Sequence, residues 1–430
     1  MHPTLLLAAS LAGPPEVRGQ IDWQAHPAMH IPWRVYGPGL TDQPPPKSHK
    51  HAFQQTVSID ALRTSGVRIF SAAAMAAEKA RSPEQARALI LEQLAYVEAF
   101  VAAHPDDFVL ARSPQEARQA LLQTDKVVVV HAIEGGRMVL SGPEDAQFWA
   151  QQGVSLVTLI HLLDDELGGA ASNPGMVGWM LNRDAARKRR KGRPRGLTDR
   201  GKAAIVELDR AGILVDLTHM SPEAVQDALA VTRAHAIPPV VTHGKLWDIH
   251  ATERGFRSED VVEIYRQGGV FNLVLSGTSL DAVDPSVPVP PDLCVGSIDS
   301  FRWHWDVLQD TLDDALFDLT GVSDRAHLDD TWKTTLATGW ASDWNGGIGH
   351  SRPTHGRRGC TRTPPEDAVD FDTRGLAHPG HLPHHWQRLE QAGVDLDPML
   401  RSAERFLQLW ERARTPVDQR PPPTPAALSP

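Results

Sequence analysis

Cysteine is scarce in this sequence. The chain has 430 residues but only two cysteines, Cys294 and Cys360. Two thiols cannot build a framework of several disulfides or a cysteine-rich zinc site. Any metal must therefore be held by histidine and carboxylate side chains. The same two cysteines fit a reducing or an oxidising compartment, so the sequence leaves the location of the protein open.

Long apolar runs and an excess of positive charge are also missing. No stretch approaches the roughly 18 uninterrupted apolar residues of a transmembrane helix. The apolar stretch 5–12 lacks the basic residues that precede the core of a secretory signal. The formal net charge of −10 gives no electrostatic reason to expect a nucleic-acid partner. The basic run 187–195 is the local exception; we expect a solvated surface loop there, with contact to an acidic partner or membrane surface as the alternative.

The chain does contain many short apolar runs rich in valine and isoleucine, which predict buried strands. They lie at 19–26, 67–75, 126–135, 154–162, 212–220, 239–244, 269–277 and 336–346. Helical patterns separate them at 82–103, 113–123, 143–152, 198–211, 222–231, 258–267 and 298–308. This alternation predicts βα units, and eight strands is the number of a (β/α)₈ barrel.

An open, doubly wound sheet would show the same alternation. We prefer the barrel because ionisable residues stand at the ends of many strands, and only a closed ring brings all of those ends to one centre. The expected organisation is a flexible segment or signal remnant at 1–18, one barrel domain at 19–415, and a disordered proline-rich tail at 416–430. Long loops are expected after strands seven and eight, at 281–293 and 350–379. A last amphipathic helix at 398–413 should pack outside the barrel, and the oligomeric state stays open, with a homo-oligomer among the options.

Barrel enzymes carry their reactive groups at the carboxyl ends of the strands. The residues that close the predicted strands here are His26, Glu134, His161, His219, His243 and Asp343. A single histidine at a strand end is most often a structural hydrogen-bonding group. Six ionisable groups at one end of a barrel would be costly to desolvate unless a cation compensates them. The pattern therefore predicts a divalent metal site with Glu134, His219 and His243 as ligands.

Five short motifs occur in the order found in a known family. They are Ile-Glu-Gly-Gly at 133–136, Leu-Ile-His at 159–161, Val-Asp-Leu-Thr-His-Met-Ser at 215–221, Pro-Val-Val-Thr-His-Gly at 239–244 and Ala-Ser-Asp-Trp-Asn-Gly at 341–346. On these motifs the chain resembles the renal (membrane) dipeptidase family from about residue 20 to residue 413. Each motif is short, so the argument depends on all five occurring in order.

The resemblance implies a (β/α)₈ barrel that holds two zinc ions and cleaves dipeptides. Glu134 would bridge the two ions, and His219 and His243 would complete the second site. His161 would orient the scissile carbonyl, and Asp343 would transfer the proton. Arg254 would bind the substrate carboxylate, but the family has Arg-Asn at this position whereas this chain has Arg254-Gly255, so a plain surface arginine is the alternative.

The first strand departs from the family. The family ends it with a His-x-Asp ligand pair, whereas Gln24 and His26 stand at those two positions here. A neutral amide is a poor zinc ligand beside an imidazole, so the first zinc is expected to be weak or absent. The leading hypothesis is a metal-dependent hydrolase of dipeptides or related small amides, with a small molecule as its partner. The alternatives are a non-catalytic binding module and a lactone or N-acyl amino acid hydrolase.

Overall fold

The computed structural model describes residues 16–42, 57–76, 78–172, 182–280 and 287–420. Most of the predicted N-terminal segment, including 5–12, lies outside the described residues, as do 421–430 of the predicted tail and 281–286 of the first long loop. At the described edges, Arg18 pairs with Asp397 at 2.6 Å and Arg420 pairs with Asp209 at 2.5 Å. No helix in the described ranges is both long and apolar enough to cross a lipid bilayer.

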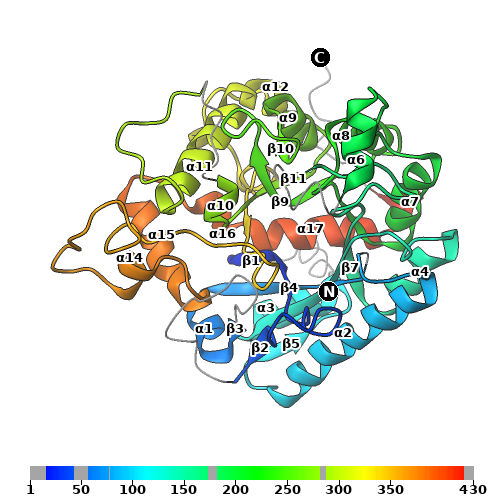
Figure 1. The fold of residues 1–430 in the computed structure, drawn as a ribbon, viewed down its shortest axis with the longest axis horizontal. Helices are drawn as coiled ribbons and strands as arrows, with labels where there is room; N and C mark the ends of the chain where they lie inside the picture. Colours follow the sequence, from blue (N-terminus) through cyan, green and yellow to red (C-terminus); the bar gives the residue numbers. More distant parts are fainter. Residues whose placement is uncertain (1–15, 43–56, 77, 173–181, 281–286, 421–430) are drawn as a thin grey trace, which may run out of the picture.

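Eight parallel strands close into a barrel (Figure 1). They are β1 (Gln20–Ala25), β4 (Val67–Met75), β6 (Val127–Glu134), β7 (Val154–Thr158), β8 (Leu214–Asp216), β9 (Val240–Leu246), β11 (Val270–Val274) and β12 (Trp340–Ala341). Each strand pairs with the next, β8 pairs with β9, and β12 pairs with β1. The predicted (β/α)₈ barrel is confirmed, and the open sheet is excluded because the ring has no free edge.

Short strands and helices complete the fold. β5 (Phe108–Leu110) pairs with β6, β10 (Gly255–Phe256) pairs with β9, and β2 (Leu40–Thr41) pairs with β3 (Val57–Ser58). The helices are α1 (Ile59–Thr64), α2 (Pro83–Ala103), α3 (Pro114–Gln123), α4 (Pro143–Gln151), α6 (Arg183–Arg190), α7 (Asp199–Ala211), α8 (Pro222–Ala234), α9 (Ser258–Arg266), α10 (Gly277–Leu280), α11 (Ile298–Asp314), α12 (Leu316–Thr320), α13 (Asp330–Thr335), α14 (Asp370–Arg374), α15 (Leu382–Gln391), α16 (Asp397–Leu400) and α17 (Ser402–Arg414).

Three of the helices that follow strands start with the same Ser-Pro pair. In α2, α3 and α8 the serine before the helix accepts a hydrogen bond from a backbone N–H in the first turn, and proline takes the first helical position. The serine satisfies a donor that the helix itself cannot, and proline presets the helical φ. These helix starts are therefore set by local sequence, which explains why they agree with the predicted boundaries.

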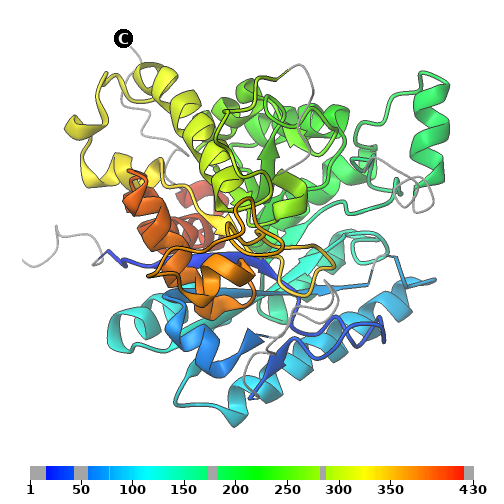
Figure 2. The same cartoon turned by 60° about the vertical axis from the view of Figure 1, so that its left-hand side comes forward.

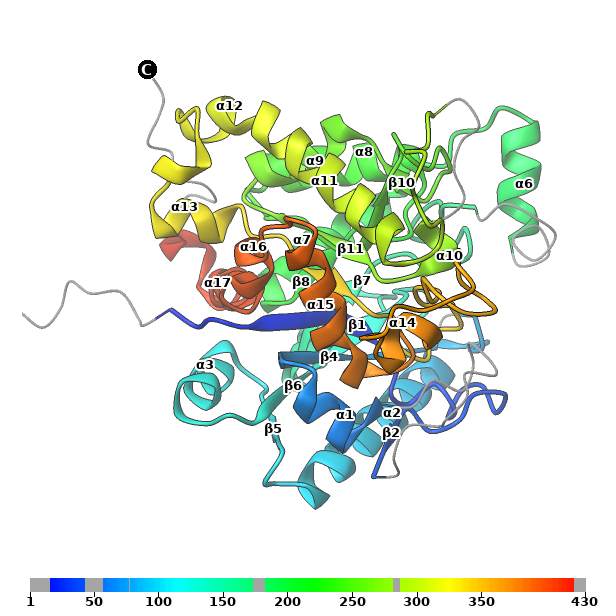
Figure 3. The same cartoon turned by 90° about the vertical axis from the view of Figure 1, so that its left-hand side faces the viewer.

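Helix α17 closes the amino-terminal end of the barrel, whereas the sequence placed this helix on the outside. Its Phe406 packs edge-on against Trp23 of β1 with ring centroids 5.4 Å apart, inside one apolar cluster with strand residues. Ala403 N donates to Gly19 O, and Arg405 donates to Gly268 O, both just before strands begin. Figure 3 shows α17 on one side of the strands and α10 and α14 on the other. The polar site must therefore lie at the opposite, carboxyl-terminal mouth.

The basic run is only partly the solvated loop that the sequence predicted, because Arg187, Lys191 and Arg193 are exposed but other members of the run form ion pairs. Its first part belongs to α6, which projects from the body of the molecule (Figure 2). Lys188 pairs with Asp164 at 3.1 Å. Arg195 is buried and pairs with both Asp164, at 3.0 Å, and Glu253, at 2.7 Å. Lys188 and Arg195 therefore hold the chain segment after β7 to Asp164 and Glu253, and of these two basic side chains only that of Arg195 is buried.

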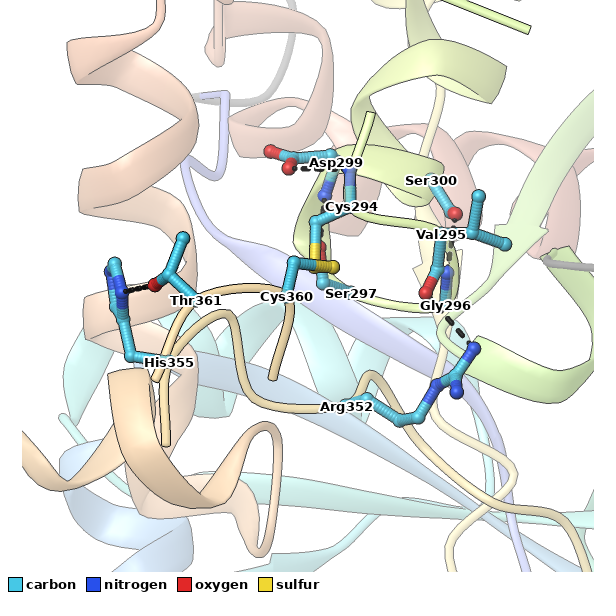
Figure 4. The surroundings of a disulfide bond; sticks show 10 residues. All are labelled: Cys294, Val295, Gly296, Ser297, Asp299, Ser300, Arg352, His355, Cys360 and Thr361. Carbon is cyan, nitrogen blue, oxygen red and sulfur yellow. Dashed lines mark hydrogen bonds between the residues drawn. A yellow bond between two sulfur atoms is a disulfide. The ribbon is translucent and has the colours of Figure 1, made fainter. Parts of the chain in front are cut away.

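The two cysteines form a disulfide, a role that the sequence did not assign to them. Cys294 and Cys360 are bonded, and they join the long loops that follow β11 and β12 (Figure 4). Beside the disulfide, Arg352 N donates to Gly296 O at 2.7 Å, and the Arg352 side chain donates to Val295 O at 2.9 Å. The second loop also contains α14. The two loops are thus held to one another.

The position of α17 yields a stability prediction. Phe406→Ala removes a fully buried ring against the barrel floor and should lower the free energy of unfolding by about 3–5 kcal/mol. The matched control is Phe317→Ala, because Phe317 is 65% exposed and should change stability by less than about 1 kcal/mol. Denaturant unfolding of both variants measures the difference. Equal losses would mean that α17 does not carry the barrel floor.

Candidate metal centre

The carboxyl ends of the strands gather the predicted ionisable residues in one buried site. Glu134 is the last residue of β6, and His243 lies within β9. The other predicted residues follow β1, β7, β8 and β12 within three positions; they are His26, His161, His219 and Asp343. All six side chains are buried. Backbone geometry aids this convergence, because His219 and Asp343 have left-handed φ values of 71° and 53° that turn the chain back at the strand ends.

Glu134, His219 and His243 form a group with the dimensions of a metal site. Glu134 Oε1 lies 3.3 Å from His219 Nε2 and 3.6 Å from His243 Nε2, and the two imidazole nitrogens are 2.9 Å apart. An ion with tetrahedral bonds of about 2.0–2.1 Å places its ligand atoms about 3.3 Å from each other. A carboxylate and two imidazoles are also the donor types that zinc and related ions prefer. These three residues therefore fit a divalent metal.

The electrostatic environment keeps these groups in the protonation states that a metal needs. Burial, followed by the positive charge of Arg254, lowers the pKa of His219 well below its usual value. Burial also lowers the pKa of His243. Burial alone would raise the pKa of Glu134, but the adjacent His161 and His26 hold that pKa well below its usual value. Two neutral imidazoles and an anionic carboxylate therefore face one another.

A chain of hydrogen bonds behind the site orients His243. Thr242 Oγ1 lies 2.8 Å from His243 Nδ1 and donates to Asp216 Oδ2 at 2.8 Å. Thr158 also donates to Asp216 Oδ2, at 2.6 Å. Because Thr242 then accepts from Nδ1, the His243 Nε2 lone pair is directed at the metal position. The sequence analysis missed Thr242 and Asp216, although each stands next to a predicted ligand or at a strand end.

The first strand presents Gln24 and His26 to the same centre. His26 Nε2 lies 3.1 Å from Asp343 Oδ1, 3.2 Å from Glu134 Oε2 and 3.4 Å from Gln24 Nε2. Gln24 Oε1 is buried and contacts no donor in the described part of the chain. Burial opposes protonation of His26, but Glu134 and Asp343 together raise the pKa of His26 to about 10. Both carboxylates therefore contact the same nitrogen of His26, whereas its Nδ1 is buried without a partner among the described residues.

His161 is held by a carboxylate that the sequence analysis missed. Glu78 Oε1 lies 2.7 Å from His161 Nδ1, and His161 Nε2 is 3.4 Å from Glu134 Oε2. Burial would lower the pKa of His161, but Glu134 and Glu78 raise it. Glu78 follows β4 by three residues and is the only acidic residue between that strand and Ser82. Its position three residues after a strand end could have marked Glu78 as a candidate site residue.

Arg254 lies at the site rather than on the open surface. Its Nη2 is 3.4 Å from His219 Nε2, and Nη1 is buried with no acceptor among the described residues. Burial lowers the pKa of Arg254 to about 10. The preceding residue, Glu253, is anchored by Arg195 at 2.7 Å. The excursion that contains the basic run therefore supports the loop that carries Arg254.

A second group with metal-ligand chemistry lies in α14 and the long loop after β12, apart from the predicted strand-end residues. Asp370, His378 and His381 approach one another closely enough to share an ion. Asp370 Oδ2, however, already pairs with Arg374 at 2.6 Å, and its side chain is largely exposed. The arginine supplies the positive charge in this group, so we assign no metal to it.

The hydrogen-bond chain behind His243 can be tested by removing one hydroxyl. Thr242→Val keeps the shape of the side chain but leaves His243 Nδ1 without its acceptor, so metal affinity should fall by about 10- to 100-fold. Thr242→Ser, which keeps the hydroxyl, is the matched control and should stay near the parent. Competition with a chelator of known affinity measures both variants. Unchanged affinity in Thr242→Val would show that the hydroxyl does not orient the ligand.

Comparisons with known proteins agree with this architecture. The model of the membrane dipeptidase family (peptidase family M19) matches residues 36–333, a range that contains Glu134, His219 and His243 but not β1 or Asp343. An uncharacterised dipeptidase of Schizosaccharomyces pombe is 27% identical over 180 residues. That match covers 42% of this chain and 39% of the relative, so the chain spans about two fifths of the length of that relative.

Solved structures share the fold at low identity. Dipeptidase AC, a metallopeptidase, superposes with a TM-score of 0.62 and 16% identity, covering 93% of this chain and 99% of that chain. A metallopeptidase from Rhodobacter sphaeroides, liganded with a phosphinate mimic of the dipeptide L-Ala-D-Ala, superposes with a TM-score of 0.61 and 15% identity, covering 93% and 100%. At this identity the likeness shows a shared barrel.

Proposed function

The chain belongs to the membrane dipeptidase family, and on this premise we propose that it is a metal-dependent hydrolase that cleaves dipeptides. The observation that carries the proposal is the buried group of Glu134, His219 and His243 beside Asp343. A barrel used only for binding has no need of such a cluster, because desolvating it costs free energy unless a cation is bound. This favours the enzyme over the non-catalytic alternative.

We propose zinc as the ion held by Glu134, His219 and His243. An ion held there would supply Lewis acidity and would make water a stronger nucleophile near neutral pH. The protein contributes the rest of the chemistry. Asp343 takes a proton from the attacking water and passes it to the departing amine. Gly346 makes room for this carboxylate, because a side chain at position 346 would overlap Asp343 Oδ1.

His161 and Arg254 would position the substrate. His161 is buried beside Glu134, and Glu78 fixes its ring, so that its Nε2 faces the reacting centre and can orient the scissile carbonyl. The Arg254 guanidinium is half-buried at the same mouth, and its described contacts include no carboxylate partner. A half-buried cation of this kind favours a substrate with a free carboxylate. Dipeptides and N-acyl amino acids have one, whereas simple lactones do not.

The role of Asp343 is tested by removing its basicity. Asp343→Asn should lower kcat on dipeptides by about a hundredfold or more, because general base catalysis contributes on that scale. The metal content should stay at the parent value, since Asp343 is not among the proposed ligands. Asp318→Asn, at an exposed surface position, is the matched control. Full activity of Asp343→Asn would rule out Asp343 as the general base, and loss of metal would show that Asp343 is a ligand.

The role of Arg254 is tested with paired substrates. The parent should prefer a dipeptide over the corresponding dipeptide amide, which lacks the carboxylate. Arg254→Ala should reduce that preference by about 10- to 150-fold, the ratio that corresponds to a hydrogen bond with a charged partner. The ratio of kcat/KM for the two substrates measures the effect. A preference that survives in Arg254→Ala would place substrate carboxylate recognition elsewhere, and equal use of lactones by the parent would favour the alternative activity.

A further inference from the structure

The end of the first strand differs from the rest of the site, because a hydrogen-bond donor stands where an ion is expected. We infer that His26 takes the place of the first metal ion of the family: its Nε2–H joins Glu134 to Asp343, and the centre works with one ion. This inference rests on the proposed function for the identity of the one ion. It assigns His26 as a positioning residue rather than a metal ligand.

Strand pairing forces His26 and Asp343 together. His26 N donates to Trp344 O at 2.8 Å, and Asp343 N donates to Gln24 O at 2.7 Å. A bridge between Ala25 and Trp344 continues the pairing of β1 with β12. The backbone therefore sets the contact of 3.1 Å between His26 Nε2 and Asp343 Oδ1. A carboxylate at position 26, as in the family, would stand beside Asp343 and would require a cation.

Glu134 divides its two oxygens between the two halves of the centre. Oε1 faces His219 and His243, whereas Oε2 lies 3.2 Å from His26 Nε2. Two buried carboxylates in one pocket repel each other unless a positive group or a donor lies between them. Glu134 and Asp343 each place one oxygen within hydrogen-bond distance of His26 Nε2. The imidazole N–H thus links the carboxylates that a bridging ion would otherwise hold together.

Gln24 does not complete the first metal site of the family. Its Nε2 lies 3.4 Å from His26 Nε2. Because two donors cannot share that contact, an Nε2–H on His26 requires the amide oxygen of Gln24 there. With the amide turned over, the neutral oxygen would still be a weak ligand for zinc. Asp343 also has an oxygen near His26. However, the described residues that gather at metal-ligand spacing around Glu134 are His219 and His243, not His26 or Asp343. The donor set therefore does not fit a first ion.

The test is the number of zinc ions per chain, measured by elemental analysis after equilibration with excess zinc and removal of free metal. All variants are made in a His381→Ala background, so that the group at Asp370 cannot add to the count. The full chain, His26→Gln and His26→Ala should each hold one ion. The double variant Gln24→His with His26→Asp restores the ligand pair of the family and should hold two. Circular dichroism confirms that each variant is folded.

Measurements of kcat distinguish a positioning role of His26 from a role as a metal ligand. His26→Ala should lower kcat by at least about tenfold with little change in KM, because Asp343 loses the donor that holds it. His26→Gln, whose amide nitrogen reaches the position of Nε2, should recover part of that loss. Two ions in the full chain with one in His26→Ala would overturn the inference, as would a second ion gained by Gln24→His alone. If no variant hydrolyses dipeptides, the proposed function fails, and the ion counts still decide the role of His26.

Discussion

The rest of the site depends on one constraint, the burial of the Glu134 carboxylate at the carboxyl mouth of the barrel. Its side chain is almost without solvent contact, and four imidazoles lie within about hydrogen-bond range of its two oxygens. A buried anion is stable only when positive charge or donors surround it. His219 and His243, together with the proposed metal, compensate one oxygen, and His26 and His161 compensate the other. This division gives the centre two chemically different halves.

The barrel accommodates the buried Glu134 carboxylate because its apolar and polar contacts lie at opposite ends of its axis. Helix α17 closes the amino-terminal end with buried aromatic rings, so the polar side chains concentrate at the other end. At that end, backbone hydrogen bonds between β1 and the residues after β12 place His26 and Asp343 next to each other. The left-handed backbone at His219 and Asp343 then turns both side chains into the centre, a strain that the surrounding packing must stabilise.

The loops around the mouth are held by contacts between residues far apart in the sequence. The disulfide joins the loops after β11 and β12, and Arg195 links the excursion after β7 to Glu253, next to Arg254. The residues that we propose for substrate recognition therefore depend on segments outside the regular βα repeat. Glu78 also lies on such a loop, because it contacts His161 from the segment after β4. These segments surround the proposed metal position, whose candidate ligands lie at the strand ends.

The sequence by itself determined the barrel and the strand-end residues, because alternating apolar runs, Ser-Pro helix starts and chemical motifs are local signals. It also located the unusual Gln24 and His26 pair. Only the tertiary structure decided what that pair contacts, that α17 lies under the barrel, that the basic run pairs with Asp164 and Glu253, and that Cys294 meets Cys360. Each of these depends on the spatial meeting of segments separated by tens to hundreds of residues. Local periodicity in the sequence does not predict these long-range contacts, because they follow from closure of the barrel and from compensation of buried charge.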